Sequence, residues 1–244
     1  MSGHSHAKTI KHKKDIADAK KGKIFSKLGR LISIAAKEKG GDPTTNSALR
    51  MAIEKARSVN MPKDNVERAI KRGTGELEGA ILEGFLYEAY GPGGTALIIE
   101  GVTDNKNRTL SEIKHILDIH GGKFAQGGNV QWLFERKGVI TIQLTNNQLP
   151  ITKEDLELKV IDAGAEDVCW SNDTLYVYTK IENLEKVKQN LENQEIIIES
   201  ASFDWVAKNP VRVGEQKTKD ELARLFEALD EHDDVQEIYS NLAA

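Results

Sequence analysis

The spacing of apolar residues predicts three helices in the first third of the chain. Apolar side chains recur every three or four residues over 15–38, the period of a helix with one buried face. A GGDP segment ends this helix, and the same period predicts a second helix over 46–59. A third helix covers 60–76, with Pro62 in its first turn and Gly73 as its stop. We therefore expect a small all-helical domain at the N-terminus.

Strand patterns replace the helical period in the next part of the chain. Two β-rich apolar runs surround Gly-Pro-Gly-Gly within 83–104, which predicts a hairpin. No GK[ST] sequence or helix follows these glycines, so a phosphate-binding loop is discounted. Thr109 and Glu112 form a capping box that starts a helix over 110–119. Residues 121–135 predict a glycine-rich loop and a strand that ends in a Trp and a Phe.

The following seventy residues form a complete unit of alternating strands and helices. The expected order is strand 138–144, helix 152–163, strands 166–171 and 174–179, helix 181–193 and strand 195–206. This βαββαβ order is that of a ferredoxin-like fold. One amphipathic helix over 218–230 and one strand over 235–239 remain, and they cannot form a domain alone. We expect them to return to the sheet begun by 83–135 and to complete it.

The resulting prediction is an α+β fold of three domains. Residues 1–79 form a basic helical nucleic-acid-binding domain with a flexible N-terminal arm. Residues 80–135 and 209–244 together form a discontinuous α/β domain. Residues 136–208 form the βαββαβ domain inserted into it, so that both α/β domains are of ferredoxin-like type.

Composition narrows the class of protein further. Its 39% hydrophobic and 30% charged residues are typical of a globular protein in solution. No stretch approaches the ~18 consecutive apolar residues of a membrane span, and the N-terminus lacks the apolar core of a secretory signal. Cys169 is the only cysteine, which excludes an intrachain disulfide and a CxxC pair. We expect a cytoplasmic protein that does not bind membranes.

Charge is distributed very unevenly along the chain. Residues 1–75 contain 18 Lys and Arg against 7 Asp and Glu, a net charge of +11, whereas the remainder carries 16 against 31, a net charge of −15. Such an asymmetry predicts a polyanionic partner for the N-terminal part. Lys20, Lys23, Lys27 and Arg30 recur at helical spacing and form one stripe. The candidate nucleic-acid-binding residues are Lys8, Lys11, Lys13, Lys14, Lys20, Lys21, Lys23, Lys27, Arg30, Arg50, Lys63, Arg68, Lys71 and Arg72.

Catalytic and metal-binding patterns do not emerge from the sequence. It contains no GxSxG, HExxH or Walker-type motif. His4, His6 and His12 lack a carboxylate or thiol at ligand spacing, and the acidic run at 230–234 is interpreted as a solvated helix end. We therefore expect a protein that is not an enzyme, with no cofactor, no metal and no catalytic residues.

Many short motifs resemble the YebC/PmpR family over essentially the whole chain. They are GHS (3–5), IKHKK (10–14), DAKKGKIFSKL (18–28), GGDP (40–43), NMPKDNVERAIKRGTGE (60–76), YGPGG (90–94), TDNKNRT (103–109), HGG (120–122) and DDVQEIYSN (233–241). The family commonly begins GHSKW, whereas this chain has Ala7 in place of the aromatic residue. The resemblance implies a helical domain and two α/β domains around a cleft, and no catalytic activity. It also implies either a DNA-binding transcriptional regulator or a translation factor that acts on the ribosome, including at proline-rich stalls.

The leading hypothesis is thus a nucleic-acid-binding regulator of gene expression. Its candidate cations are mostly lysines, which suit phosphate contacts better than base readout and favour sequence-tolerant binding, as on structured ribosomal RNA. The family resemblance points equally to DNA. A second hypothesis is a scaffold whose acidic α/β domains bind a protein partner, while the basic arm binds their acidic surface or a membrane. A third is a weak enzyme in the interdomain cleft. We expect a monomer.

Overall fold

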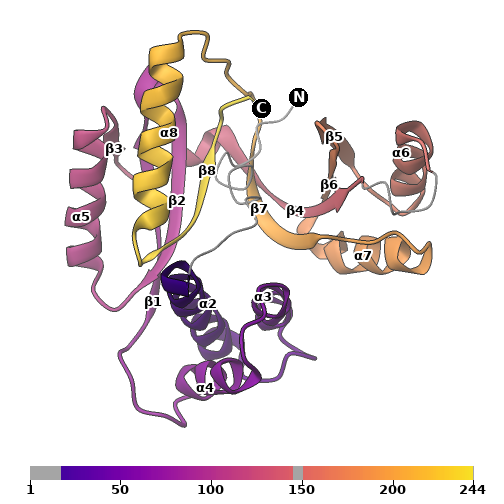
Figure 1. Ribbon diagram of the computed structural model, residues 1–244, viewed down its shortest axis with the longest axis horizontal. Coiled ribbons are helices and arrows are strands. Elements are labelled where there is room, and N and C mark those ends of the chain that lie inside the picture. The colour runs from indigo at the N-terminus through magenta and orange to yellow at the C-terminus, as the bar shows by residue number, and fades with distance from the viewer. Residues whose placement is uncertain (1–17, 145–150, 244) are drawn as a thin grey trace.

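The computed structural model describes residues 18–144 and 151–243, with side chains from Lys21 onward. Three helices form one end of the molecule (Figure 1): α2 (Asp18–Lys39), α3 (Ser47–Ser58) and α4 (Lys63–Gly73). Their buried faces enclose a core of their own, formed by Leu28, Ile32, Ala35, Ala36, Leu49, Ala52, Ile53, Ala56, Met61, Val66 and Ala69. No helix in the described ranges is long and apolar enough to cross a membrane.

Two local devices fix the packing of these helices. The buried side chain of Asn46 accepts a hydrogen bond from Leu49 N (3.0 Å) and donates to Ala35 O (2.8 Å), so it caps α3 and ties it to α2. Gly73 lies against α2 so closely that a Cβ atom there would stand 2.2 Å from Ser33 O. The glycine interpreted from sequence as a helix stop is therefore also the contact point of two helices.

A first antiparallel sheet has the strand order β3-β1-β2-β8. It consists of β1 (Glu83–Tyr90), β2 (Ala96–Thr103), β3 (Lys123–Ala125) and β8 (Val235–Ser240). Helices α5 (Lys106–Ile119) and α8 (Gln216–Glu231) cover one face of it. Their shared core includes Ile99, Ile113, Leu117, Leu225 and Phe226. The short 3-10 helices η1 (Pro92–Gly94) and η2 (Gln131–Leu133) belong to its loops.

A second antiparallel sheet has the order β5-β6-β4-β7, which is the ferredoxin-like order. It consists of β4 (Phe134–Gln143), β5 (Asp167–Ser171), β6 (Thr174–Thr179) and β7 (Ser200–Ala207). Helices α6 (Lys153–Asp162) and α7 (Leu184–Asn193), the latter preceded by η3 (Ile181–Asn183), pack on one face. This sheet lies in sequence between β3 and α8, and β8 then returns to the first sheet, which supports the predicted insertion. The residue bounds of the three domains stay a prediction.

The mixed fold class is confirmed, and three local predictions are wrong. Helix α5 begins at Lys106 because Asn105 caps it, accepting from Arg108 N at 3.1 Å, so Thr109 lies inside the helix. The strand expected to contain Trp132 begins only at Phe134. Strand β7 begins at Ser200, five residues later than expected. The connectivity of the first sheet, ββαβαβ, also differs from that of the second.

The loop before β4 is organised by a buried carboxylate. Glu88 on β1 is 3% exposed and accepts backbone hydrogen bonds from Gly128, Val130 and Gln131. Three donors fixed around one carboxylate hold this loop in a single conformation. Trp132 is consequently held on the surface with its indole N–H bonded to Asn129 O at 2.9 Å, instead of lying in a strand.

Candidate nucleic-acid interface

The predicted lysine stripe on α2 faces the acidic end of the same chain. The lower end of α8 and the start of β8 meet the first turns of α2 in Figure 1. Lys23 Nζ lies 3.7 Å from Asp233 Oδ1, and Lys27 Nζ lies 3.9 Å from Asp230 Oδ1. Arg30 forms an ion pair with Asp234. Three of the predicted phosphate-binding cations are thus engaged within the protein.

Asp234 is the centre of this contact and is not the solvated helix end expected from sequence. Its side chain is 3% exposed. Its Oδ2 accepts from Thr109 Oγ1 (2.6 Å), Thr103 Oγ1 (3.1 Å) and Arg108 Nη2 (2.8 Å), while its Oδ1 faces Arg30. Burial alone would raise the pKa of Asp234, but the hydrogen bonds from Thr109, Arg108 and Arg30 lower it to about 2.

Glu112, His232 and Asp234 bring three possible metal ligands within 4.8 Å of one another. His232 Nε2 lies 2.9 Å from Glu112 Oε2, and its Nδ1 accepts from Asp234 N at 3.1 Å. Arg30 and Arg108 both pair with Asp234, and their positive charges would repel a metal ion bound beside it. These residues therefore do not fit a metal site.

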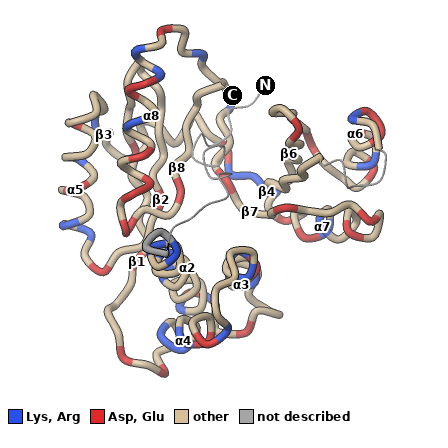
Figure 2. The backbone as a smooth tube through the Cα atoms, in the orientation of Figure 1, with Lys and Arg blue, Asp and Glu red and all other residues tan. Residues whose placement is uncertain are grey.

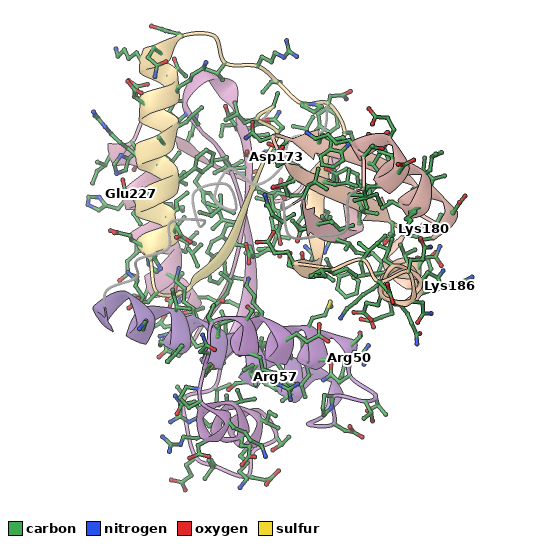
Figure 3. The ribbon with its side chains drawn as sticks, turned by 45° about the vertical axis from the view of Figure 1, so that its right-hand side comes forward. Arg50, Arg57, Asp173, Lys180, Lys186 and Glu227 are labelled. Atoms are coloured by element: carbon green, nitrogen blue, oxygen red, sulfur yellow. The ribbon has the colours of Figure 1, made fainter. Side chains whose placement is uncertain are left out.

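Two cations of α3 form ion pairs with acidic residues of the α/β domains, one in each domain. Arg50, one of the candidate nucleic-acid-binding residues, lies at the end of the helical domain that faces α7 (Figure 3). Its Nη2 lies 3.1 Å from Glu185 Oε2 on α7, and its Nη1 donates to Pro43 O. Lys55 pairs with Glu237 on β8. A polar cavity of about 630 Å³ lies between α3 and α7, and charged groups of opposite sign pair across it.

An outward cationic surface remains on the other side of the helical domain, visible as blue segments on α4 in Figure 2. Arg68, Lys71 and Arg72 are exposed. None of these three forms an ion pair with a residue in the described part of the chain. We call them the α4 surface. Arg57 on α3, which is absent from the predicted set, is also exposed and has no ion-pair partner among the described residues.

The remaining predicted residues occupy other environments. Lys63 is exposed at the start of α4, and its Nζ lies 3.5 Å from Glu67 Oε1 of the same helix. Lys21 is exposed in the first turns of α2. Lys8, Lys11, Lys13 and Lys14, like the three N-terminal histidines, lie outside the described residues, as does the side chain of Lys20. All of them stay predictions as contacts to nucleic acid.

The architecture defines a class of protein in which a basic helical domain is attached to two α/β domains. Residues 5–76 match the family model of the TACO1/YebC protein N-terminal domain, and residues 82–242 match that of the TACO1/YebC second and third domain. The chain belongs to the TACO1/YebC family.

Relatives in this family have similar lengths and related names. A "probable transcriptional regulatory protein" of Halothermothrix orenii is 48% identical over 241 residues, covering 99% of this chain and 94% of that one. One of Pseudothermotoga lettingae, with the same name, is 49% identical over 244 residues, covering 99% and 93%. The crystal structure of a conserved hypothetical protein from Aquifex aeolicus superposes with a TM-score of 0.87 at 44% identity, covering 96% of this chain and 94% of that chain.

Proposed function

We propose that this chain is a regulator of gene expression that binds nucleic acid through its helical domain. The observation that carries the proposal is the α4 surface: three exposed cations whose guanidinium and ammonium groups have no described acidic partner. Phosphate oxygens are the natural partners of such groups, and an array of them supplies sequence-independent affinity. The names of the relatives support a role in the regulation of transcription. In this version of the proposal, DNA is the ligand.

The alternative is a translation factor that binds ribosomal RNA and relieves stalling at proline-rich stretches. Two of the three cations lie in the last turn of α4, where they also complement the helix dipole. Phosphate contacts carry no sequence information, and structured RNA is recognised mostly by its shape and backbone. Crosslinking in cells separates the two versions: discrete promoter peaks support DNA, and enrichment of ribosomal RNA supports the alternative.

The first prediction tests the surface itself. Replacing Arg68, Lys71 and Arg72 together by Gln should weaken binding to duplex DNA and to structured RNA by similar factors. Each phosphate interaction that the substitutions remove should also flatten the slope of log affinity against log salt by about 0.7–0.9. Affinities measured by fluorescence anisotropy over a range of salt concentrations check both effects.

A matched variant controls for net charge. Lys180, Lys186 and Lys219 are exposed cations of the α/β domains, and replacing them by Gln removes the same charge from other surfaces. We expect this control to keep most of the affinity and the original salt slope. Equal losses in the two triple variants would show that the α4 surface makes no specific contribution.

A further inference from the structure

The contact between α2 and the C-terminal acidic residues consists of polar interactions. In the described part of the chain, the core of the helical domain contains no residue of the first sheet, and the core beneath α5 and α8 contains none of the helical domain. Between them lie the ion pairs of Lys23, Lys27 and Arg30 with Asp233, Asp230 and Asp234. Gln236 adds one hydrogen bond, to Lys27 O at 3.1 Å. We call this contact the α2 clamp.

One of the three pairs in the α2 clamp is open to water on both sides, and a second is open on its acidic side. The side chains of Lys23 and Asp233 are 39% and 68% exposed, whereas in the second pair Asp230 is 41% exposed and Lys27 is 13% exposed. Ion pairs of this kind contribute little stability, and dissolved salt screens them. The clamp is therefore weak enough to open, and its strength depends on ionic strength.

The buried ion pair of the α2 clamp, between Arg30 and Asp234, can break without leaving Asp234 unpaired. Asp234 keeps Arg108 as a second cationic partner on its Oδ2, together with the hydroxyl groups of Thr103 and Thr109. Removing the sole partner of a buried charge is strongly destabilising, but here a paired and hydrogen-bonded carboxylate remains. Detachment of α2 leaves only Oδ1 to be solvated. The first sheet can thus stay folded in the open state.

The cations of the clamp are also suited to phosphate. Lys23, Lys27 and Arg30 form one stripe on α2, and carboxylates now occupy the positions that backbone phosphates would take. The acidic residues belong to the same chain, so they compete at a high effective concentration. Nucleic acid offers more negative charges in a row and gains entropy from released counterions.

We propose that a nucleic-acid backbone displaces Asp230, Asp233 and Asp234 from the α2 stripe, so that the helical domain leaves β8 when it binds. The proposal rests on the proposed function and describes the regulation of the same domain. The α4 surface makes the first contact, because its cations are accessible in the closed state. Opening of the α2 clamp then adds three cations to the binding surface. The acidic end of the chain acts as an internal competitor that weakens binding to short or sparsely charged ligands.

The second prediction concerns affinity. The double variant Asp230→Asn and Asp233→Asn removes the two exposed competitors and leaves Asp234 in place. It should bind a short duplex DNA about three- to tenfold more tightly, as expected for the loss of two partly exposed ion pairs. The control, Glu227→Gln with Glu231→Gln, removes the same charge from exposed positions on α8 that make no described ion pair with α2. It should bind as the wild type does, and equal gains in both variants would overturn the proposal.

A second measurement follows the movement directly. Donor and acceptor dyes attached to Cys at positions 67 and 227, in a Cys169→Ser background, report the separation of α4 from α8. We expect energy transfer to fall when duplex DNA, structured RNA or heparin is added, with half-saturation at the concentration that half-saturates anisotropy. Binding with unchanged energy transfer would overturn the α2 clamp proposal and leave the proposed function intact. Failure of all three ligands to bind would overturn both.

Discussion

At the scale of single residues, the carboxylate of Asp234 joins segments that are far apart in the sequence. Arg30 lies 204 residues before it, and Thr103 and Arg108 lie 131 and 126 residues before it. Its backbone also takes part, because its carbonyl oxygen accepts from Val102 N at 2.8 Å. A carboxylate with several charge-assisted hydrogen bonds is held in its ionised form. Asp234 thus connects the start of β8 to β2, to α5 and to the helical domain at once.

The third prediction uses the pKa of this group. The folded protein holds the pKa of Asp234 at about 2, below its ordinary value of 3.8. The ionised form of Asp234 therefore stabilises the folded protein at pH values above the ordinary pKa. This stabilisation disappears as the pH falls from about 4 towards 2. Asp234→Asn should lower the free energy of unfolding by about 2 kcal/mol at neutral pH, and the difference from wild type should vanish in strong acid.

Urea unfolding over a range of pH measures this difference. The two proteins differ only in this side chain, so the comparison with wild type at each pH isolates the carboxylate of Asp234. Asp233→Asn is the matched control, because its side chain is 68% exposed and its removal should change stability little. If Asp234→Asn lost the same stability at every pH, the lowered pKa assigned to Asp234 would be contradicted.

At the scale of elements, hydrophobic periodicity was sufficient to predict the helices and most strands. The positions of α2, α3 and α8 follow from apolar residues at helical spacing, and the βαββαβ order of the second sheet follows from alternation of the two periods. The start of α5 was missed because Thr109 with Glu112 fits a capping box, whereas the helix begins four residues earlier with Asn105 as a simple N-cap. Local rules cannot choose between two caps when a distant carboxylate determines which side chain is buried.

The orientation of charged residues was less predictable than the elements. Arg50 and Arg57 share one helical spacing, but only Arg57 faces solvent, because α7 packs beside Arg50. The stripe on α2 was found from its spacing, and its acidic partners were not. Pairing between segments some 200 residues apart depends on the tertiary arrangement, which no local pattern contains.

The fourth prediction tests the packing of two elements. A Cβ atom at position 73 would stand 2.2 Å from Ser33 O and 2.8 Å from Ala36 Cβ, where the backbone itself must move. Gly73→Ala should therefore destabilise the helical domain by about 1–3 kcal/mol, as overpacking does elsewhere. Gly22→Ala is the control, because nothing lies within 4 Å of its added Cβ and alanine favours helix by about 0.5–1 kcal/mol. Thermal unfolding followed by circular dichroism compares the two, and equal melting temperatures would contradict the close approach of α4 to α2.

At the scale of the whole molecule, the three parts are joined in two different ways. The two sheets share an apolar cluster that includes Ile98, Phe134, Ala207 and Tyr239. Glu100 adds polar bonds across the same junction, to Arg136 at 2.9 Å and to the indole of Trp205 at 2.8 Å. The helical domain meets the first sheet through ion pairs and hydrogen bonds. Among its described residues, Met51 of α3 alone packs against the core of the second sheet. Apolar burial makes domains unfold together, whereas exposed ion pairs couple them weakly.

The fifth prediction follows from this difference. The three tryptophans, Trp132, Trp170 and Trp205, all lie in the α/β domains, so their fluorescence reports those domains alone. Far-ultraviolet circular dichroism also records α2, α3 and α4. In urea, we expect the dichroism to begin changing at lower concentration than the fluorescence, because the helical domain unfolds before the joined sheets. Added salt should widen the gap by screening the α2 clamp. Gly73→Ala should move only the early dichroism transition, and a single transition shared by both signals at every salt concentration would show that the helical domain is not an independent unit.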